Sequence, residues 1–326
     1  DLKMTILKDQ RVIAIEEHYY DAEIVSHFKD IDAKTGGSLR AILEDVGEGR
    51  IKSMDEVGVD VQVLSHGAPS TQRMDAESGV RVAKAANDRL YDIVRNHPDR
   101  FAAFANLPTA DPQASADELE RTVEKLGFKG AMIHGLIGEE YLFIDNERFW
   151  PIFERAQALD VPLYIHPANP HPAVVDIYLK DYLDAFPHLR QAGWGFTMET
   201  ATIGLRIVLS GVLDKYPDVK IILGHLGEGL PFLMWRIDMA LNRPGNDGVR
   251  FRDLFTRNFY ITTSGFFSDP ALLCCIQEMG VDHIMFAIDY PFVPNEPGPK
   301  WMERLMLNAD DKAKILHGNA ERLLRM

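Results

Sequence analysis

Short β-branched and aromatic runs alternate along the chain with segments whose apolar residues recur every three or four positions. Eight of the short runs predict strands, at residues 11–18, 61–66, 101–107, 130–134, 162–166, 219–225, 259–264 and 283–289. The segments with the longer period predict helices, at residues 40–56, 78–95, 114–126, 146–159, 204–215, 230–240 and 271–279. Strands that alternate with helices favour a parallel sheet with right-handed crossovers. Eight such units predict an α/β chain folded as a (β/α)8 TIM barrel.

The chain shows no repeat, low-complexity tract or long linker, so we expect one domain over residues 1–326. Two connections are longer than ordinary loops, namely residues 19–38 after the first strand and 167–196 after the fifth. Both follow the carboxyl ends of strands, where barrel enzymes carry their active sites. We therefore expect these two insertions to form the walls and lid of a pocket.

Composition narrows the class of protein. Hydrophobic residues make up 46% and charged residues 26%, a globular composition without an apolar run of about 18 residues, so we expect no membrane span. The 35 basic and 49 acidic side chains give a net charge of −14, which argues against binding nucleic acid. The only cysteines, Cys274 and Cys275, are adjacent and form no disulfide framework, which predicts a cytoplasmic protein.

Histidines gather where the predicted strands end. Five of the eleven take such positions: His18, His66, His134, His166 and His225. A single histidine at a strand end is more often structural than functional. Here five histidines gather at one rim of the barrel, and Asp289 ends the eighth strand at the same rim. Glu16 lies two residues before His18, so both side chains face the barrel mouth while Glu17 faces the helices. Imidazoles and carboxylates together predict a site for a divalent cation.

Each of the other candidate side chains near this rim has two possible roles, one functional and one structural. Glu228 follows His225 by three residues, so it either fixes the imidazole tautomer or caps the next helix. Arg236 either clamps an anionic substrate or forms a surface ion pair. Tyr290 and Phe292 either sandwich a flat substrate or pack in the core.

At these positions the sequence resembles the second amidohydrolase family, in particular its aromatic-acid decarboxylase branch. That branch includes γ-resorcylate, 2,3-dihydroxybenzoate and 5-carboxyvanillate decarboxylases. The resemblance covers almost the whole chain and rests on nine short motifs in order: Ile15-Glu16-Glu17-His18, Pro98-Asp99-Arg100-Phe101, Leu126-Gly127-Phe128-Lys129-Gly130, Tyr164-Ile165-His166-Pro167, Gly224-His225-Leu226-Gly227-Glu228, Trp235-Arg236-Ile237-Asp238, Thr262-Thr263-Ser264-Gly265, Ile288-Asp289-Tyr290-Pro291-Phe292 and Asn319-Ala320.

The resemblance implies one metal ion and a set of roles. The wider superfamily opens with His-x-His, whereas this chain has Glu-x-His, as the decarboxylase branch does. Mn²⁺, Zn²⁺ and Mg²⁺ all suit mixed imidazole and carboxylate ligands. The implied ligands are Glu16, His18, His166 and Asp289. The resemblance also implies that His225 and Glu228 form a supporting dyad. It implies substrate contacts at Arg236, Tyr290 and Phe292.

Two positions depart from the branch. His134 stands where related decarboxylases often carry Asn, and His66 replaces a common apolar residue. We expect both to line the substrate pocket. We expect His134 to be protonated and to bind the departing carboxylate or a ring substituent, because a neighbouring anion raises the pKa of an imidazole.

The implied activity is a carbon–carbon lyase reaction in aromatic compound catabolism. A dihydroxybenzoate-like acid would lose CO2 without oxidation after Asp289 protonates the ring carbon, with His225 and Glu228 relaying the proton. No dinucleotide or phosphate-binding loop is present, so we expect no organic cofactor. The alternatives are a metal-dependent hydrolase of an ester, lactone or amide with Asp289 as general base, and a catalytically inactive binding protein. The resemblance implies that the protein binds a small aromatic carboxylate as its substrate. It also implies a homodimer or homotetramer.

Overall fold

The computed structural model describes residue 7 and residues 10–326, so residues 1–6 and 8–9 of the predicted domain lie outside the described residues. Within the described part, eight strands occur where the sequence predicts them. Their bounds are β1 Ile13–Tyr19, β2 Val61–His66, β3 Phe101–Ala103, β4 Ala131–His134, β5 Leu163–His166, β6 Ile221–Leu223, β7 Phe259–Thr262 and β8 Ile284–Met285. β6 and β8 are shorter than predicted because ladder pairing ends before the chain reaches the site.

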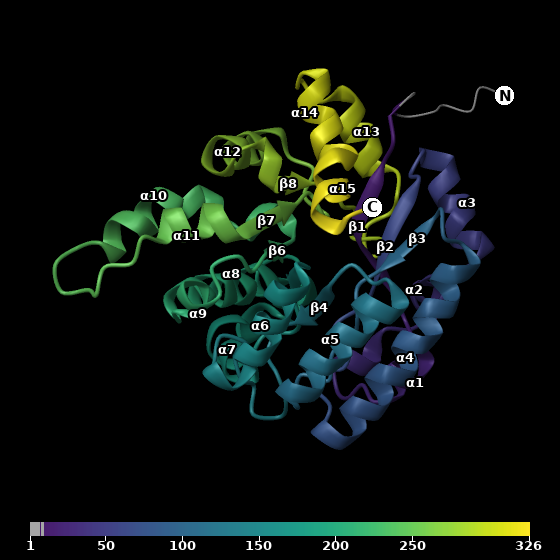
Figure 1. The fold of residues 1–326 in the computed structure, drawn as a ribbon, viewed down its shortest axis with the longest axis horizontal. Coiled ribbons are helices and arrows are strands. Elements are labelled where there is room, and N and C mark those ends of the chain that lie inside the picture. Colours follow the sequence, from purple (N-terminus) through teal and green to yellow (C-terminus); the bar gives the residue numbers. More distant parts are fainter. Residues whose placement is uncertain (1–6, 8–9) are drawn as a thin grey trace.

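The strands form a barrel from two parallel sheets (Figure 1), in the orders β1-β2-β3 and β4-β5-β6-β7-β8. Backbone hydrogen bonds join the sheets at both seams. At one seam the Ala105 amide donates to the Gly130 carbonyl at 2.8 Å. At the other, the His18 amide donates to the Tyr290 carbonyl at 2.6 Å. The predicted (β/α)8 barrel is therefore confirmed, and β1 lies beside the segment that follows β8.

Helices surround the strands (Figure 1). The α-helices are α1 Ala22–Ser26, α2 Gly37–Glu44, α3 Glu48–Val57, α4 Ala76–Asn96, α5 Pro112–Leu126, α6 Trp150–Leu159, α7 Pro172–Val174, α8 Gly195–Leu209, α9 Val212–Lys215, α10 Leu230–Leu241, α11 Phe251–Asn258, α12 Asp269–Met279, α13 Pro297–Arg304, α14 Ala309–Ala313 and α15 Asn319–Leu324. The short 3-10 and π segments are η1 Asp32–Lys34, η2 Glu147–Phe149, η3 Val175–Leu179, η4 Lys180–Tyr182, η5 Pro187–Arg190, η6 His225–Gly227, η7 Val281–His283 and η8 Lys314–Gly318.

Two helix predictions need correction, and several helices were not predicted. The predicted helix 40–56 is two helices, because the Asp45 side chain accepts the Gly47 amide at 3.0 Å and ends α2. The predicted helix 204–215 is also two, since α8 starts nine residues earlier and Gly211, at a φ of +86°, separates it from α9. The sequence pattern missed α11 and the carboxyl-terminal helices α13, α14 and α15.

Alternate residues of the strands fill the barrel interior. Side chains such as Ile13, Val63 and Ile222 are buried there, whereas their strand neighbours pack outward against the helices. Ala320 and Leu323 of α15 join the same interior cluster and close the barrel at the amino ends of the strands. The opposite end, where the strands terminate, carries the polar residues of the site.

The two predicted insertions contain short helices of their own. Residues 19–38 include α1 and η1, and residues 167–196 include α7 and η3 to η5. No helix among the described residues is both long and apolar enough to cross a membrane. Cys274 and Cys275 are both free thiols on α12. The cytoplasmic location stays a prediction.

Candidate metal centre and active site

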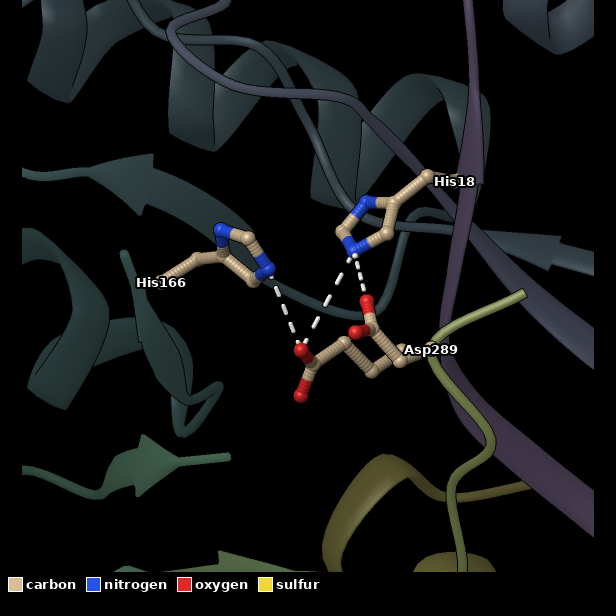
Figure 2. Close-up of side chains that lie close together, drawn as sticks. His18, His166 and Asp289 are labelled. Atoms are coloured by element: carbon tan, nitrogen blue, oxygen red, sulfur yellow. Dashed lines mark ion pairs between the residues drawn. The ribbon is translucent and has the colours of Figure 1, made fainter. Parts of the chain in front are cut away.

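Four predicted ligands converge at the carboxyl end of the barrel. One ligand atom from each of Glu16, His18, His166 and Asp289 lies within 4.8 Å of the other three. His166 Nε2 is 3.1 Å from Glu16 Oε1, and His18 Nε2 is 3.1 Å from Asp289 Oδ1. Figure 2 shows the two imidazoles and the carboxylates turned toward one common point.

The unpaired atoms of this cluster fit a divalent cation. Glu16 Oε1, His18 Nε2 and His166 Nε2 are buried and have no hydrogen-bond partner. Buried polar atoms are nearly always hydrogen-bonded, so three orphans facing one point indicate a bound ion as their common partner. Burial lowers the pKa of His18, which favours the neutral imidazole that a metal requires. The donor set therefore fits one divalent metal ion.

An irregularity in β1 points two consecutive residues into the barrel. The register with β2 pairs Ala14 with Gln62 but Glu17 with Leu64, so β1 contains one extra residue. Ile15 packs in the barrel interior, and Glu16 next to it also faces inward. The bulge thus shifts the inward-facing positions of β1 by one residue. As a result, Glu16 and His18 both face the candidate metal site.

The second oxygen of Glu16 is held by the barrel interior. Oε2 accepts hydrogen bonds from Tyr164 and, at 3.4 Å, from Thr262. A side chain at Gly224 would come within 2.4 Å of the same oxygen, so this position accommodates glycine alone. Glu16 is therefore fixed with Oε1 left for the ion.

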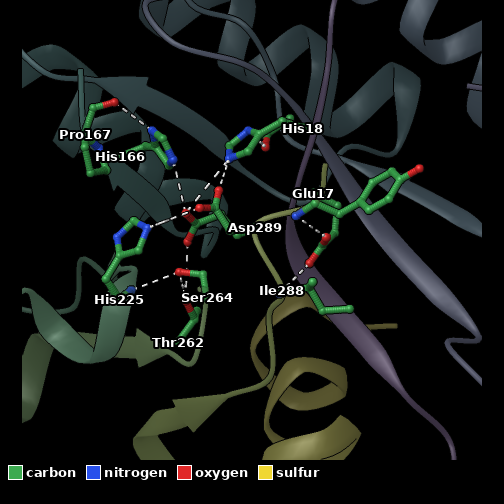
Figure 3. A network of polar contacts seen from close by, with 12 residues as sticks. Glu17, His18, His166, Pro167, His225, Thr262, Ser264, Ile288 and Asp289 are labelled. Atoms are coloured by element: carbon green, nitrogen blue, oxygen red, sulfur yellow. Dashed lines mark hydrogen bonds and ion pairs between the residues drawn. The ribbon is translucent and has the colours of Figure 1, made fainter. Parts of the chain in front are cut away.

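Glu17 faces away from the cluster and holds the segment of Asp289. Its carboxylate accepts the Ile288 amide at 2.9 Å and the Tyr290 amide at 3.1 Å, and Figure 3 shows the first of these contacts. The Asp289 amide between them donates to the Glu16 carbonyl at 3.1 Å. Asp289 has a φ of +73°, a left-handed conformation that non-glycine residues seldom adopt. These three contacts hold the strained backbone in place.

His225 and Glu228 form the predicted dyad. His225 Nδ1 is 2.5 Å from Glu228 Oε1, and Nε2 is 3.5 Å from Glu16 Oε1 and 3.7 Å from Asp289 Oδ2. Both residues have positive φ, in a turn that Ser264 holds by accepting the His225 amide at 2.9 Å (Figure 3). Burial opposes protonation, but Glu228 and Glu16 outweigh it and hold the pKa of His225 well above its ordinary value.

The same charges act on the two carboxylates. Burial opposes the ionisation of Asp289, but hydrogen bonds from His18 and His225 lower its pKa. Burial likewise opposes the ionisation of Glu16, yet His225 and His166 lower its pKa. These neighbours favour the ionised form of both carboxylates, which is the form that binds a metal ion.

His134, at the end of β4, lies beside His166. Its Nδ1 is 3.0 Å from His166 Nδ1, which is also 2.7 Å from the Pro167 carbonyl. Burial together with the imidazoles of His166 and His18 holds the pKa of His134 well below its ordinary value. These neighbours favour the neutral imidazole, and the predicted cation, which depends on a substrate carboxylate beside His134, stays a prediction.

The contact between the two imidazoles fixes their tautomers. If His166 coordinates an ion through Nε2, its Nδ1 carries the hydrogen and donates to the Pro167 carbonyl. The facing Nδ1 of His134 can then only accept, so the hydrogen of His134 sits on Nε2. This Nε2 is buried and has no hydrogen-bond partner.

His66 is a structural residue in this fold. Within β2 the inward position belongs to Ser65, which is 3.2 Å from His18 Nδ1, so the next side chain points outward. His66 Nε2 accepts the Asp21 amide at 2.9 Å, and Nδ1 is 2.8 Å from the Gly67 carbonyl. Both ring nitrogens are occupied, so His66 anchors the segment after β1 and offers no donor to a substrate.

Three predicted substrate contacts remain, and only one of them lies beside the candidate ligands. The Phe292 ring is 5.6 Å from the His18 ring, which places it beside the ligands. Tyr290 instead packs 5.0 Å below the buried Arg50 guanidinium of α3. Arg236 is exposed on α10 and forms no salt bridge among the described residues. Its substrate contact stays a prediction.

Sequence reasoning missed the residues that support the ligands. Arg50 is buried and donates to the His18 carbonyl at 2.6 Å, and Tyr164 and Thr262 hold Glu16. The alternation of β5 and β7 carried the signal for the last two, because both share the inward face with the site. No sequence pattern indicated Arg50, which reaches β1 from a helix.

Comparison with known proteins identifies the family to which this chain belongs. The model of the amidohydrolase family matches residues 39–326, which is most of the chain. The chain therefore belongs to the amidohydrolase family, as its resemblance implied.

Particular relatives narrow this class to decarboxylases. The chain is 40% identical to the γ-resorcylate decarboxylase of Polaromonas sp. (strain JS666), with 96% of this chain and 98% of that protein covered. A Polaromonas dihydroxybenzoic acid decarboxylase structure with manganese and 2-nitroresorcinol is 39% identical, covers 97% of both chains and has a TM-score of 0.88. A 5-carboxyvanillate decarboxylase structure from Novosphingobium aromaticivorans, also with manganese, is 30% identical, covers 100% of this chain and 99% of the other, and has a TM-score of 0.91.

We predict that His166→Ala abolishes metal binding. Wild-type protein purified without chelator should contain about one divalent ion per chain by elemental analysis. Removing that ion should lower the melting temperature, and adding Mn²⁺ at a hundredfold excess over Kd should restore about 2.7 kcal/mol of stability. The exposed His188→Ala variant is the matched control and should behave as wild type. A stoichiometric ion in His166→Ala would show that the ligand set is wrong.

Proposed function

We propose that this protein is a metal-dependent decarboxylase of a hydroxylated aromatic carboxylic acid of the dihydroxybenzoate type. The observation that carries the proposal is the cluster of Glu16, His18, His166 and Asp289 beside the His225–Glu228 pair. Named γ-resorcylate decarboxylases that match this chain over nearly its full length support it. The enzyme is a carbon–carbon lyase that releases CO2 without an organic cofactor.

The metal site supplies one part of the chemistry. When bound, a divalent cation, for which we propose Mn²⁺ with Zn²⁺ and Mg²⁺ as alternatives, favours the phenolate form of the substrate as a Lewis acid. Manganese in two similar solved structures supports this choice. Phe292 lies beside the ligands and presents an aromatic edge to a flat ring.

The chain's own residues move the proton. His225 shares its Nδ1 hydrogen with Glu228, and its Nε2 faces Asp289 Oδ2 at 3.7 Å. We propose that His225 passes a proton to Asp289, which delivers it to the ring carbon that carries the carboxylate. The ring carbon gains a C–H bond, the bond to the carboxylate breaks, and its electron pair restores aromaticity as CO2 leaves. Glu228 stabilises His225 while it is protonated.

We expect the wild-type enzyme to convert 2,6-dihydroxybenzoate into resorcinol and one equivalent of CO2. In D2O the resorcinol should carry one deuterium at the carbon that held the carboxylate, because the proton comes from the exchangeable His225–Asp289 pair. Mass spectrometry of the product and CO2 detection measure both. Glu228→Gln should lower kcat by about 100-fold or more while the metal content stays unchanged. The exposed Glu303→Gln variant is the control.

These outcomes separate the candidate functions. An ester, lactone or amide hydrolase would release no CO2 from this substrate. An inactive binding protein would bind the acid and leave it unchanged. The hydrolase alternative relied on extra imidazoles at His66 and His134, and His66 is now occupied by backbone contacts.

We also propose that the unpartnered Nε2 of His134 donates a hydrogen bond to the substrate carboxylate or to a ring hydroxyl. His134→Ala should lower kcat/KM by roughly 10- to 150-fold, the value of a hydrogen bond to a charged group. His134→Asn should be milder because an amide can still donate. Metal content should be unchanged in both variants. Unchanged kinetics with a lower melting temperature would show that His134 serves only packing.

We further propose a homo-oligomer, a dimer or tetramer. Phe232 and Trp235 on α10 are 81% and 68% exposed, and Leu233 between them is 43% exposed. Figure 1 shows α10 and α11 extending away from the barrel. Large exposed apolar side chains this close together on one helix are typical of an interface, so a second copy of the chain is the partner we propose. Light scattering at micromolar concentration should give a multiple of 36.8 kDa, whereas a monomeric mass would refute this proposal.

A further inference from the structure

The backbone pairing between β4 and the chain that follows β3 ends before it reaches His134. Along this seam the Ala105 amide donates to the Gly130 carbonyl at 2.8 Å, and the Met132 amide donates to the Ala105 carbonyl at 3.3 Å. Bonds of a parallel ladder recur every two residues, so the next one on this side would run from the His134 amide to the Leu107 carbonyl. The His134 amide instead donates to a side chain.

The side chain of Gln72 takes the place of that ladder bond. Its Oε1 accepts the His134 amide at 3.1 Å, and its Nε2 donates to the Leu107 carbonyl, also at 3.1 Å. One amide group thus bridges the donor and the acceptor that the two strands would otherwise bring together. All three residues are buried, so these bonds are shielded from water and the loss of either would leave a buried polar group without its partner.

Gln72 is itself held by its backbone and by its neighbour in the sequence. Its amide donates to the Pro69 carbonyl at 3.2 Å, and its carbonyl accepts the Gly138 amide at 2.7 Å. Thr71 Oγ1 donates to the same Leu107 carbonyl at 2.6 Å and accepts from Gln72 Nε2 at 3.3 Å. The glutamine therefore joins the segments after β2, β3 and β4 at one buried point.

This bridge holds one edge of β4 where the strand presents the His134 imidazole. At the other edge the Gly135 amide donates to the His166 carbonyl at 2.9 Å, so β5 holds that side. The backbone of His134 is thus fixed between the Gln72 amide and a strand that carries a candidate metal ligand. A change in the Gln72 bridge would therefore move the His134 Nε2, which has no hydrogen-bond partner in the protein.

We propose that Gln72 is a positioning residue for substrate binding and that it acts through His134. The inference rests on the proposed function, in which His134 Nε2 donates to the substrate. Gln72 keeps β3 and β4 separated by one amide group, and this separation sets the distance and the angle at which His134 meets the bound acid. Hydrogen bonds weaken steeply when their geometry departs from the optimum, so a small shift of β4 lowers the affinity.

A double-mutant cycle tests whether Gln72 acts through His134. Isothermal titration of the Mn²⁺-loaded protein measures the affinity for 2-nitroresorcinol, in which a nitro group replaces the carboxylate of 2,6-dihydroxybenzoate and cannot leave as CO2. Gln72→Met preserves the length of the side chain and removes both hydrogen bonds, so it should weaken binding about fivefold or more. In a His134→Ala background the same substitution should change the affinity by less than about twofold, because coupled residues are not additive.

Two further variants at this position separate reach from polarity. Gln72→Glu retains an oxygen that accepts the His134 amide, and burial favours its protonated form, which can still donate to the Leu107 carbonyl. Its affinity should therefore be closer to wild type than that of Gln72→Met. Gln72→Asn keeps the amide but is one carbon too short to span both groups, so it should weaken binding as the methionine variant does. It also keeps the test valid if Gln72→Met folds poorly.

Gln157→Met is the matched control for losing a glutamine that accepts a backbone amide. Gln157 Oε1 accepts the Asp218 amide at 2.8 Å, at the opposite end of the barrel. This variant should bind 2-nitroresorcinol as the wild type does. Melting temperatures and metal contents of all variants show whether a loss of affinity has a cause other than the position of His134.

The possible outcomes are distinguishable. Unchanged affinity in Gln72→Met and Gln72→Asn would overturn the proposal, as would an equal loss with and without the His134 imidazole. Unchanged affinity in His134→Ala would remove the group through which Gln72 acts and would overturn it as well. CO2 release from 2,6-dihydroxybenzoate in any of these cases would leave the proposed decarboxylase function intact. A coupled loss of affinity without CO2 release from any hydroxylated benzoate would support the role of Gln72 and refute the decarboxylase.

Discussion

The contact between β1 and the segment after β8 determines the rest of the site. Glu17 accepts the backbone amides on either side of Asp289, and the Glu16 carbonyl accepts the Asp289 amide itself. The same seam closes the barrel. Because Glu16 lies on β1 and Asp289 in the segment after β8, closing the barrel at this seam also brings these two candidate ligands together. A change that loosens this seam would therefore weaken the barrel and the ligand geometry together.

Without a metal ion, these closely spaced buried charges are electrostatically unfavourable. Neighbouring side chains make the cluster less unfavourable. The buried Glu16 carboxylate and the half-buried Asp289 carboxylate face imidazoles whose Nε2 atoms have no hydrogen-bond partner, and charges of this kind need a partner. The protein compensates in part through the Tyr164 hydroxyl on Glu16 and through the imidazole of His225. A divalent cation satisfies the rest, so ion binding and folding stability are thermodynamically linked.

The alternation of strand residues made the barrel and the convergence of Glu16 and His18 predictable. Where a strand departs from this alternation, the prediction was incomplete. Period-two reasoning placed Glu16 and His18 on one face, which the structure confirms, but it could not reveal the bulge that turns this face inward. Applied within β2, the same rule assigns the inward position to Ser65, so the outward direction of His66 was available from the sequence. The partner of Tyr290 was not, because Arg50 reaches it from a helix remote in the sequence.

The candidate metal site and the two insertions occupy different parts of this fold. The ligands and the His225–Glu228 pair sit on strand ends and a tight turn, where backbone contacts fix them within the barrel. A cavity of about 470 Å³ is lined by these insertions and by the loops after β2 and β4, segments that can change without disturbing the strands. His134 lies at the boundary, since its Nδ1 contacts a metal ligand while its Nε2 has no partner. A substitution there would remove the contact with His166 Nδ1, but the Pro167 carbonyl would still hold that nitrogen, so the orientation of His166 does not depend on His134 alone.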